Sequence, residues 1–299
     1  MLPAPASRAG LQRRVDGRVT RWQDAFVSDA DFTWNSVLVD GNWIRYRVAG
    51  PVDAPPMIHQ HGFAISGSYL LPTARLLTDS FRVYVPDLPG FGRSPKPAQP
   101  LSIEELGRTL SHFMDAVGLE QAVVVGNSLG CAITAELVAQ DPGKVSKAVM
   151  VGLAGGPHNR PLAKALVQMA RDGLVEPPAL LTVAGPDYVR FGMIRAIKLF
   201  DRMTKFPAYE RFMSLPVPVM VVIGSEDPLR PPWRNISRAM HEIPPQITIV
   251  LFQGAAHAIN FTHPRELASA IRQYVAGDEV RMDADNPTGV PVLQLQRPV

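Results

Sequence analysis

Cysteine is nearly absent from this chain of 299 residues, which contains only Cys131. A single cysteine excludes an intramolecular disulfide and a zinc site built from several cysteines, and it is compatible with a reducing compartment. Strong charge of one sign is also lacking, because the formal net charge is only +3. The composition therefore offers no electrostatic footprint for nucleic acid.

Long apolar runs are missing as well. No uninterrupted apolar stretch approaches the roughly 18 residues of a membrane-spanning helix. The first residues lack the continuous apolar segment of a secretory signal. We therefore expect no membrane span and a cytoplasmic location. Residues 1–30 are predicted to form an irregular arm, and we interpret its cluster of arginines as solvated.

The remaining composition is that of an ordinary globular protein, with 46% hydrophobic and 19% charged residues. Short apolar runs alternate with helical patterns over residues 31–153 and 215–276. Ser102 is a candidate helix N-cap, with Glu105 three residues later completing a capping box. This alternation predicts an α/β fold with a mostly parallel, doubly covered sheet.

Residues 154–214 interrupt the alternation. They are rich in Met, Phe and Arg and contain helical stretches separated by Gly and Pro, without a convincing strand pattern. They are predicted to form a helical insertion between two strands. Ligands of open α/β sheets bind outside the carboxyl ends of the strands, so we expect the insertion to cover the site. Residues 277–299 are predicted to form a loose C-terminal tail.

A serine lies between two glycines in Gly126-Asn127-Ser128-Leu129-Gly130, directly after three valines and before a helical pattern. This G-x-S-x-G pattern is typical of a sharp strand-to-helix turn that presents a nucleophilic serine. An N-cap serine is the alternative, but the flanking strand and helix favour the nucleophile. The N–H of Leu129 would lie at the helix N-terminus, where it can stabilise an oxyanion.

A serine hydroxyl needs a base, and the base needs an orienting acid. With this turn the expected chain order is Ser, then Asp or Glu, then His. Asp227 is the predicted acid, because it follows a strand in a G-x-x-D pattern, and the neighbouring Glu226 is its rival. His257 is the predicted base, because it follows the next strand. His263 directly precedes a proline and is a better candidate for a helix cap.

The second oxyanion donor is predicted at the end of an earlier strand, in His61-Gly62-Phe63. Gly62 permits the backbone twist, and the N–H of Phe63 could point to the same position as that of Leu129. We interpret His61 as a structural histidine that hydrogen-bonds this loop. Gly62 and Asn127 are candidate substrate contacts beside the nucleophile.

These residues together resemble the α/β-hydrolase fold family over roughly residues 35–276. The motifs that carry the resemblance are His61-Gly62, "DLPGFGRS", "GNSLG", "GSEDP" and "GAAH". The resemblance implies a catalytic triad of Ser128, Asp227 and His257, a helical cap over residues 154–214, and chemistry that needs neither cofactor nor metal. It leaves the substrate open, because the fold hosts many reactions.

The "GNS" elbow is similar to that of the C–C bond hydrolases of meta-cleavage products. The loop after His61-Gly62 and the presence of Ala258 after the histidine depart from that group. Arg190 could be a substrate-binding arginine, although it is one of several arginines in the insertion. Helical spacing favours packing over substrate contact for the apolar side chains of this segment, Met169, Met193, Met203, Met213, Phe191, Phe200, Phe206 and Phe212.

We therefore expect a serine hydrolase that acts on a small, largely apolar carboxylic ester. The alternatives are a C–C bond hydrolase, a thioesterase, a lactonase, a perhydrolase or haloperoxidase, and a non-catalytic ligand receptor. The expected partner is a small molecule, and a homodimer is a possible assembly.

Overall fold

The computed structural model describes residues 31–154, 157–282 and 290–295, and the predicted N-terminal arm lies outside them. The described residues form a nine-stranded sheet in the order β1-β2-β4-β3-β5-β6-β7-β8-β9. The strands are β1 (Thr33–Val39), β2 (Asn42–Ala49), β3 (Pro56–Gln60), β4 (Arg82–Asp87), β5 (Ala122–Asn127), β6 (Val145–Val151), β7 (Val219–Gly224), β8 (Ile247–Phe252) and β9 (Val292–Leu295). Strands β3 to β8 pair in parallel, while β1, β2 and β9 pair antiparallel at the two edges. This architecture confirms the predicted fold class.

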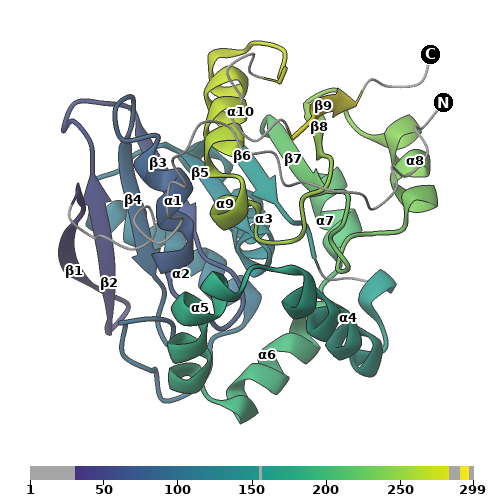
Figure 1. Ribbon diagram of the computed structural model, residues 1–299. Coiled ribbons are helices and arrows are strands. Elements are labelled where there is room, and N and C mark those ends of the chain that lie inside the picture. The colour runs from purple at the N-terminus through teal and green to yellow at the C-terminus, as the bar shows by residue number, and fades with distance from the viewer. Residues whose placement is uncertain (1–30, 155–156, 283–289, 296–299) are drawn as a thin grey trace, which may run out of the picture.

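Helices lie on both sides of this sheet (Figure 1). The α-helices are α1 (Leu71–Arg75), α2 (Ile103–Ala116), α3 (Leu129–Gln140), α4 (Leu162–Val175), α5 (Pro178–Phe191), α6 (Met193–Lys205), α7 (Ala208–Met213), α8 (Trp233–Glu242), α9 (Ile259–Thr262) and α10 (Pro264–Ala276). Short 3-10 helices are η2 (Gly67–Leu70), η3 (Pro142–Lys144) and η4 (Pro157–Asn159). No helix in the described part of the chain is long and apolar enough to cross a bilayer.

The buried strands explain the two layers of helices. Every residue of β5 is buried, and successive side chains of a strand point to opposite faces. Val124 packs in one core cluster with Phe113 of α2, whereas Val123 and Val125 pack in the other with Ile271 of α10. Both faces of the sheet are therefore covered, as the near-continuous apolar runs predict.

Local signals set several of the helix ends. The side chain of Ser102 accepts a hydrogen bond from the N–H of Glu105, and the Glu105 carboxylate accepts one from the N–H of Ser102. The predicted capping box of α2 is thus confirmed. The N-cap position of α10 is occupied by His263, and Pro264 follows it in the first turn. His263 therefore lies at a helix start.

Helices α4 to α7 form the segment between β6 and β7, which we call the helical insertion. In Figure 1, α4, α5 and α6 gather at the bottom of the view, apart from the helices that flank the sheet. Phe191, Phe200 and Phe212 of the insertion belong to the larger core cluster. The insertion is therefore anchored on the core by apolar packing.

The predicted loose tail is wrong for part of its length. Val292–Leu295 forms β9, which pairs antiparallel with β8. Val280 and Val292 are buried and belong to the second core cluster. This strand forms because the outer edge of β8 would otherwise present unpaired backbone groups, and β9 hydrogen-bonds to them. Residues 283–289 and 296–299 of the predicted tail lie outside the described residues.

Candidate active site

Ser128 lies in the turn between β5 and α3 with φ 55 and ψ −116. A positive φ is unusual for a residue other than glycine, and such strain clusters at functional sites. The flanking glycines make this turn sterically feasible. A Cβ on Gly126 would lie 2.4 Å from the Gly130 carbonyl oxygen, and one on Gly130 would lie 2.4 Å from the Gln60 carbonyl oxygen. The geometry is that expected of a strained strand-to-helix turn presenting a serine.

Asp227 and His257 are joined by a hydrogen bond although they follow different strands. His257 Nδ1 lies 2.8 Å from Asp227 Oδ2, and Asp227 Oδ1 accepts a hydrogen bond from the N–H of Leu229 at 2.7 Å. Asp227 is 3% exposed, whereas the rival Glu226 is exposed. The structure thus pairs the predicted acid with the predicted base.

Ser128 and His257 line the same cavity. The Nε2 atom of His257 is buried and has no hydrogen-bond partner among the residues that the structure describes. In enzymes with a Ser-His-Asp triad, the corresponding ring nitrogen accepts the serine proton. Catalytic hydrogen bonds of this kind are often long in the absence of substrate and tighten in the complex.

The loop that follows β3 lies directly against the serine turn. A Cβ on Gly62 would lie 3.2 Å from the Cβ of Ser128. The N–H of Gly62 donates to the Tyr69 hydroxyl at 2.9 Å, and that hydroxyl donates to Asn127 Oδ1 at 2.6 Å. Phe63 lines the cavity, and the N–H of Leu129 is the first of α3, where no intrahelical acceptor exists.

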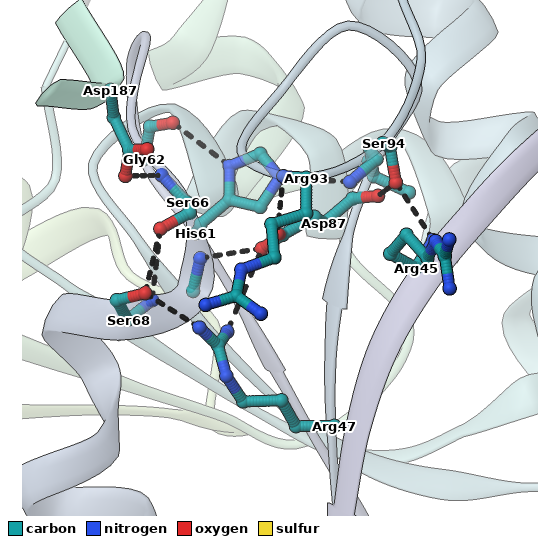
Figure 2. A network of polar contacts seen from close by, with 12 residues as sticks. Arg45, Arg47, His61, Gly62, Ser66, Ser68, Asp87, Arg93, Ser94 and Asp187 are labelled. Atoms are coloured by element: carbon teal, nitrogen blue, oxygen red, sulfur yellow. Dashed lines mark hydrogen bonds and ion pairs between the residues drawn. The ribbon is translucent and has the colours of Figure 1, made fainter. Parts of the chain in front are cut away.

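A polar network holds this loop in place (Figure 2). The Leu88 N–H donates to His61 Nε2 at 3.1 Å, so His61 Nδ1 carries the proton and donates to the Gly62 carbonyl at 3.0 Å. Burial lowers the pKa of His61. Asp87 accepts from the N–H of Gly67 at 2.8 Å. His61 is therefore a neutral positioning residue of the loop.

The two polar candidates for substrate contact, Asn127 and Arg190, lie in different surroundings. Asn127 lines the cavity, but its amide nitrogen donates to the Val151 carbonyl and its Oδ1 accepts from the Tyr69 hydroxyl, so both ends of its side chain are engaged within the protein. Arg190 does not line this cavity. Its side chain is 54% exposed and pairs with Asp187 at 3.0 Å, and Asp187 accepts from the N–H of Ser66 at 2.8 Å. The expected substrate contact of Arg190 is thus corrected: its position on α5 turns it toward Asp187.

The cavity has a volume of about 370 Å³ and is mostly apolar. Its walls combine the carboxyl ends of β3, β5, β7 and β8 with α4, α5 and α6 of the insertion. Met169, Met203 and Phe200 are the members of the predicted Met and Phe set that line it. The remaining members of the set pack elsewhere or, like Met193 at 79% exposed, face outward.

Sequence reasoning missed two acidic residues, Asp172 and Glu176, which come from the end of α4 and line the cavity. Glu176 Oε1 accepts a hydrogen bond from the N–H of Ala258 at 2.6 Å, next to His257. Burial raises the pKa of Asp172, and burial raises that of Glu176 to about 7. Their four-residue spacing on a helix was the available signal, but it does not say which surface the pair faces.

The charge around His257 follows from these acids. Burial by itself lowers the pKa of His257, but the charge of Asp227, the hydrogen bond to Asp227, and the charges of Asp172 and Glu176 raise it to about 9. Opposite charges nearby favour the imidazolium form, so the environment stabilises the protonated base. In the described part of the chain no cluster of three or more His, Cys, Asp or Glu side chains is arranged to hold a metal ion.

Cys131 follows the serine turn and is buried. Its Sγ contacts the carbonyl oxygens of Gly126 and Val151 at 3.3 and 3.4 Å. Burial raises the pKa of the thiol, which keeps it protonated. A protonated, buried thiol is a poor nucleophile, so Cys131 has a packing role.

A family model described as "Alpha/beta hydrolase family" matches residues 57–270, which is most of the chain. The protein therefore belongs to the alpha/beta hydrolase family. The match spans the serine turn, Asp227 and His257 together.

Similar proteins carry out different reactions. The chain is 25% identical over 304 residues to the dihydrolipoyllysine-residue acetyltransferase component of the acetoin cleaving system of Cupriavidus necator, covering 93% of this chain and 78% of that protein. It is 25% identical over 273 residues to a non-heme chloroperoxidase of Streptomyces lividans, covering 79% and 97%. Among solved structures, the carboxylesterase CesB of Bacillus subtilis matches with a TM-score of 0.71 and 18% identity over 86% of this chain and 95% of that one. The similarity to CesB, at this low sequence identity, shows a shared fold only.

Proposed function

We propose that this protein is a serine hydrolase that cleaves a carboxylic ester of a small, largely apolar substrate. The observation that carries the proposal is the convergence of three separated segments on one apolar cavity. Ser128 stands in a strained turn, and His257 is hydrogen-bonded to the buried Asp227 at 2.8 Å. A hydroxyl nucleophile, a base and an orienting acid in this order are the parts that acyl transfer requires.

The reaction proceeds in two steps, acylation of Ser128 and hydrolysis of the acyl-enzyme. The Ser128 hydroxyl attacks the ester carbonyl carbon and gives its proton to His257 Nε2, and the oxyanion is held by the N–H groups of Phe63 and Leu129. The bond to the alcohol oxygen then breaks as His257 returns the proton to that oxygen. Water attacks the acyl-enzyme while His257 accepts its proton. The acid leaves and Ser128 regains its hydrogen.

The helical insertion is proposed to act as a cap over this site, because it supplies much of the cavity wall. Its exclusion of water would strengthen the electrostatic interactions at the oxyanion.

A cytoplasmic location is proposed from the single, reduced cysteine. The C–C bond alternative loses its distinguishing feature, because Arg190 does not line the cavity.

A fluorophosphonate probe tests the proposal directly. We expect one adduct, located on Ser128 by peptide mass spectrometry, together with loss of hydrolysis of p-nitrophenyl butyrate. Treatment of the Ser128→Ala variant should give no adduct. An adduct on another serine, or turnover that survives complete labelling, would contradict the assignment.

The pH dependence of the reaction provides a second test. His257 must be neutral to accept the Ser128 proton, and its pKa is raised to about 9. The kcat/KM should therefore rise with pH along an acid limb lying well above the usual histidine range. Replacing Glu176 by glutamine removes a nearby negative charge, so the pKa of His257 should fall and the limb should move to lower pH.

This shift is measured by recording kcat/KM from pH 6 to 10 with correction for spontaneous ester hydrolysis. The titratable groups that act on His257 are Asp227, Asp172 and Glu176, so Asp172→Asn should move the limb in the same direction. Glu210→Gln alters an exposed carboxylate of the insertion and serves as the matched control. A limb that stays in place or moves to higher pH in Glu176→Gln would refute the electrostatic account.

A further inference from the structure

One acidic side chain of the cavity takes no part in the bond-making and proton-transfer steps of the proposed reaction. Glu176 is 8% exposed and lines the cavity. Its Oε1 is held by the N–H of Ala258 at 2.6 Å, which fixes the carboxyl group. Its other oxygen, Oε2, is buried and has no hydrogen-bond partner among the residues described by the structure. A buried acceptor without a partner is costly, so a ligand that donates to it would be bound favourably.

Asp172 repeats this pattern on the same wall. It precedes Glu176 by one helical turn, lines the cavity, and its Oδ1 is buried without a hydrogen-bond partner in the described part of the chain. Two carboxyl groups therefore border the same space. The rest of the wall around them is apolar and includes Met169, Leu180 and Leu181.

Apart from His257, no basic side chain among the described residues lines the cavity to neutralise Asp172 and Glu176. Among the described residues that line it, none is lysine or arginine, and His257 is already hydrogen-bonded to Asp227. Protonated His257 offsets only part of the negative charge of Asp227, Asp172 and Glu176, so a substrate group carrying positive charge would supply further counter-charge. A carboxylate at the same place would meet two groups of like charge.

The position of the pair selects one side of the substrate. His257 gives its proton to the oxygen of the leaving alcohol, and Glu176 is anchored to the N–H of Ala258, which directly follows His257 in the chain. The oxyanion donors, Phe63 and Leu129, belong to the loop after β3 and to the start of α3. Asp172 and Glu176 therefore border the alcohol side of the bound ester.

We propose that Asp172 and Glu176 form a cation subsite that receives a protonated amine on the alcohol portion of the substrate. This inference rests on the proposed ester hydrolysis and narrows its substrate class to esters of amino alcohols. The apolar wall holds the carbon chain, and the pair of carboxyl groups holds the ammonium N–H. The anchored Oε1 of Glu176 keeps the accepting oxygen in place before the substrate arrives, which lowers the cost of binding.

Three acetate esters of matched size test the subsite. In 3-(dimethylamino)propyl acetate the chain ends in a cation with one N–H, in 4-methylpentyl acetate it ends in the neutral isostere, and in 4-acetoxybutanoate it ends in an anion. At pH 8 the wild-type protein should show kcat/KM at least about tenfold higher for the cationic ester than for the neutral one, as expected for a hydrogen bond to a charged group. The anionic ester should be the poorest substrate.

The variants isolate the acidic pair. Glu176→Gln keeps an oxygen that accepts the Ala258 N–H but replaces the free acceptor, and Asp172→Asn removes the second charge. Each should lower the ratio of kcat/KM for the cationic ester to that for the neutral ester by about tenfold. The ratio is compared at one pH, so the altered pKa of His257 affects both esters alike. Glu210→Gln should leave the ratio unchanged, and thermal melting confirms that each variant is folded.

Ligand binding to an inactive variant tests the cation subsite independently of turnover. Calorimetry with the Ser128→Ala variant should detect tighter binding of 3-(dimethylamino)propyl acetate than of 4-methylpentyl acetate. In the double variant that also carries Glu176→Gln, the two esters should bind with equal affinity. Hydrolysis of the neutral ester without a preference for the cation would overturn the subsite and leave the proposed function standing. Failure to hydrolyse any ester, with no fluorophosphonate adduct, would overturn the proposed function, and calorimetry would then decide the subsite by itself.

Discussion

Replacement of Ser128 by alanine should lower kcat/KM for p-nitrophenyl butyrate by about 10⁵-fold, since loss of the nucleophile leaves only binding and oxyanion stabilisation. The strained turn is built by Gly126 and Gly130, whose positions do not depend on the hydroxyl. Alanine keeps the Cβ and removes only the reacting atom. The fold should therefore survive while turnover is lost. The measurement is initial-rate kinetics, with thermal melting to confirm folding.

The matched control is Ser36→Ala, which makes the same chemical change at an exposed position of β1. It should retain wild-type kcat/KM. Residual activity of Ser128→Ala above about one hundredth of wild type would mean that another group attacks the ester. Cys131 is a poor candidate for that group, because its thiol is buried and held protonated.

The second large effect is expected for Asp227→Asn, which should reduce kcat by about 10³- to 10⁴-fold. The carboxylate accepts the Nδ1 proton of His257 and so keeps Nε2 free to accept the Ser128 proton. An asparagine amide group in that place would donate a hydrogen bond to Nδ1 and favour the wrong tautomer. Asp227 is also buried at 3% exposed, so no water replaces the lost acceptor easily.

Glu226→Gln provides the matched control for this substitution. It neutralises the adjacent carboxyl group, which is exposed and is not hydrogen-bonded to His257. Its kcat should stay within about twofold of wild type. If Glu226→Gln lost activity and Asp227→Asn kept it, the acid would have been assigned to the wrong neighbour.

The central part of the candidate site could be predicted from the sequence because its signals are local. A run of buried strand residues followed by G-x-S-x-G indicates a sharp turn wherever it occurs. Asp227 and His257 each follow a strand of a parallel sheet, and the carboxyl ends of such strands share one edge. Chain order and strand ends together were therefore enough to predict that Ser128, Asp227 and His257 converge.

The acidic pair could not be predicted in this way. Asp172 and Glu176 lie in helix α4 and at its end, where no strand edge fixes their direction. The contact of Glu176 with Ala258 joins residues separated by 82 positions. It depends on how the insertion packs over the sheet, and the same packing decides that Arg190, which pairs with Asp187 within α5, does not line the cavity.

Strand β9 in the C-terminal tail also could not be predicted from the local sequence. Residues 292–295 are too short a run to indicate a strand by themselves, and they form one because the edge of β8 offers unpaired backbone groups. The sequence by itself determined the parallel sheet, the serine turn and the order of the acid and the base, since these follow from side-chain periodicity and turn residues within short windows. Only the tertiary structure decided which side chains of the insertion border the cavity, because that depends on the docking of helices whose own patterns are compatible with several orientations.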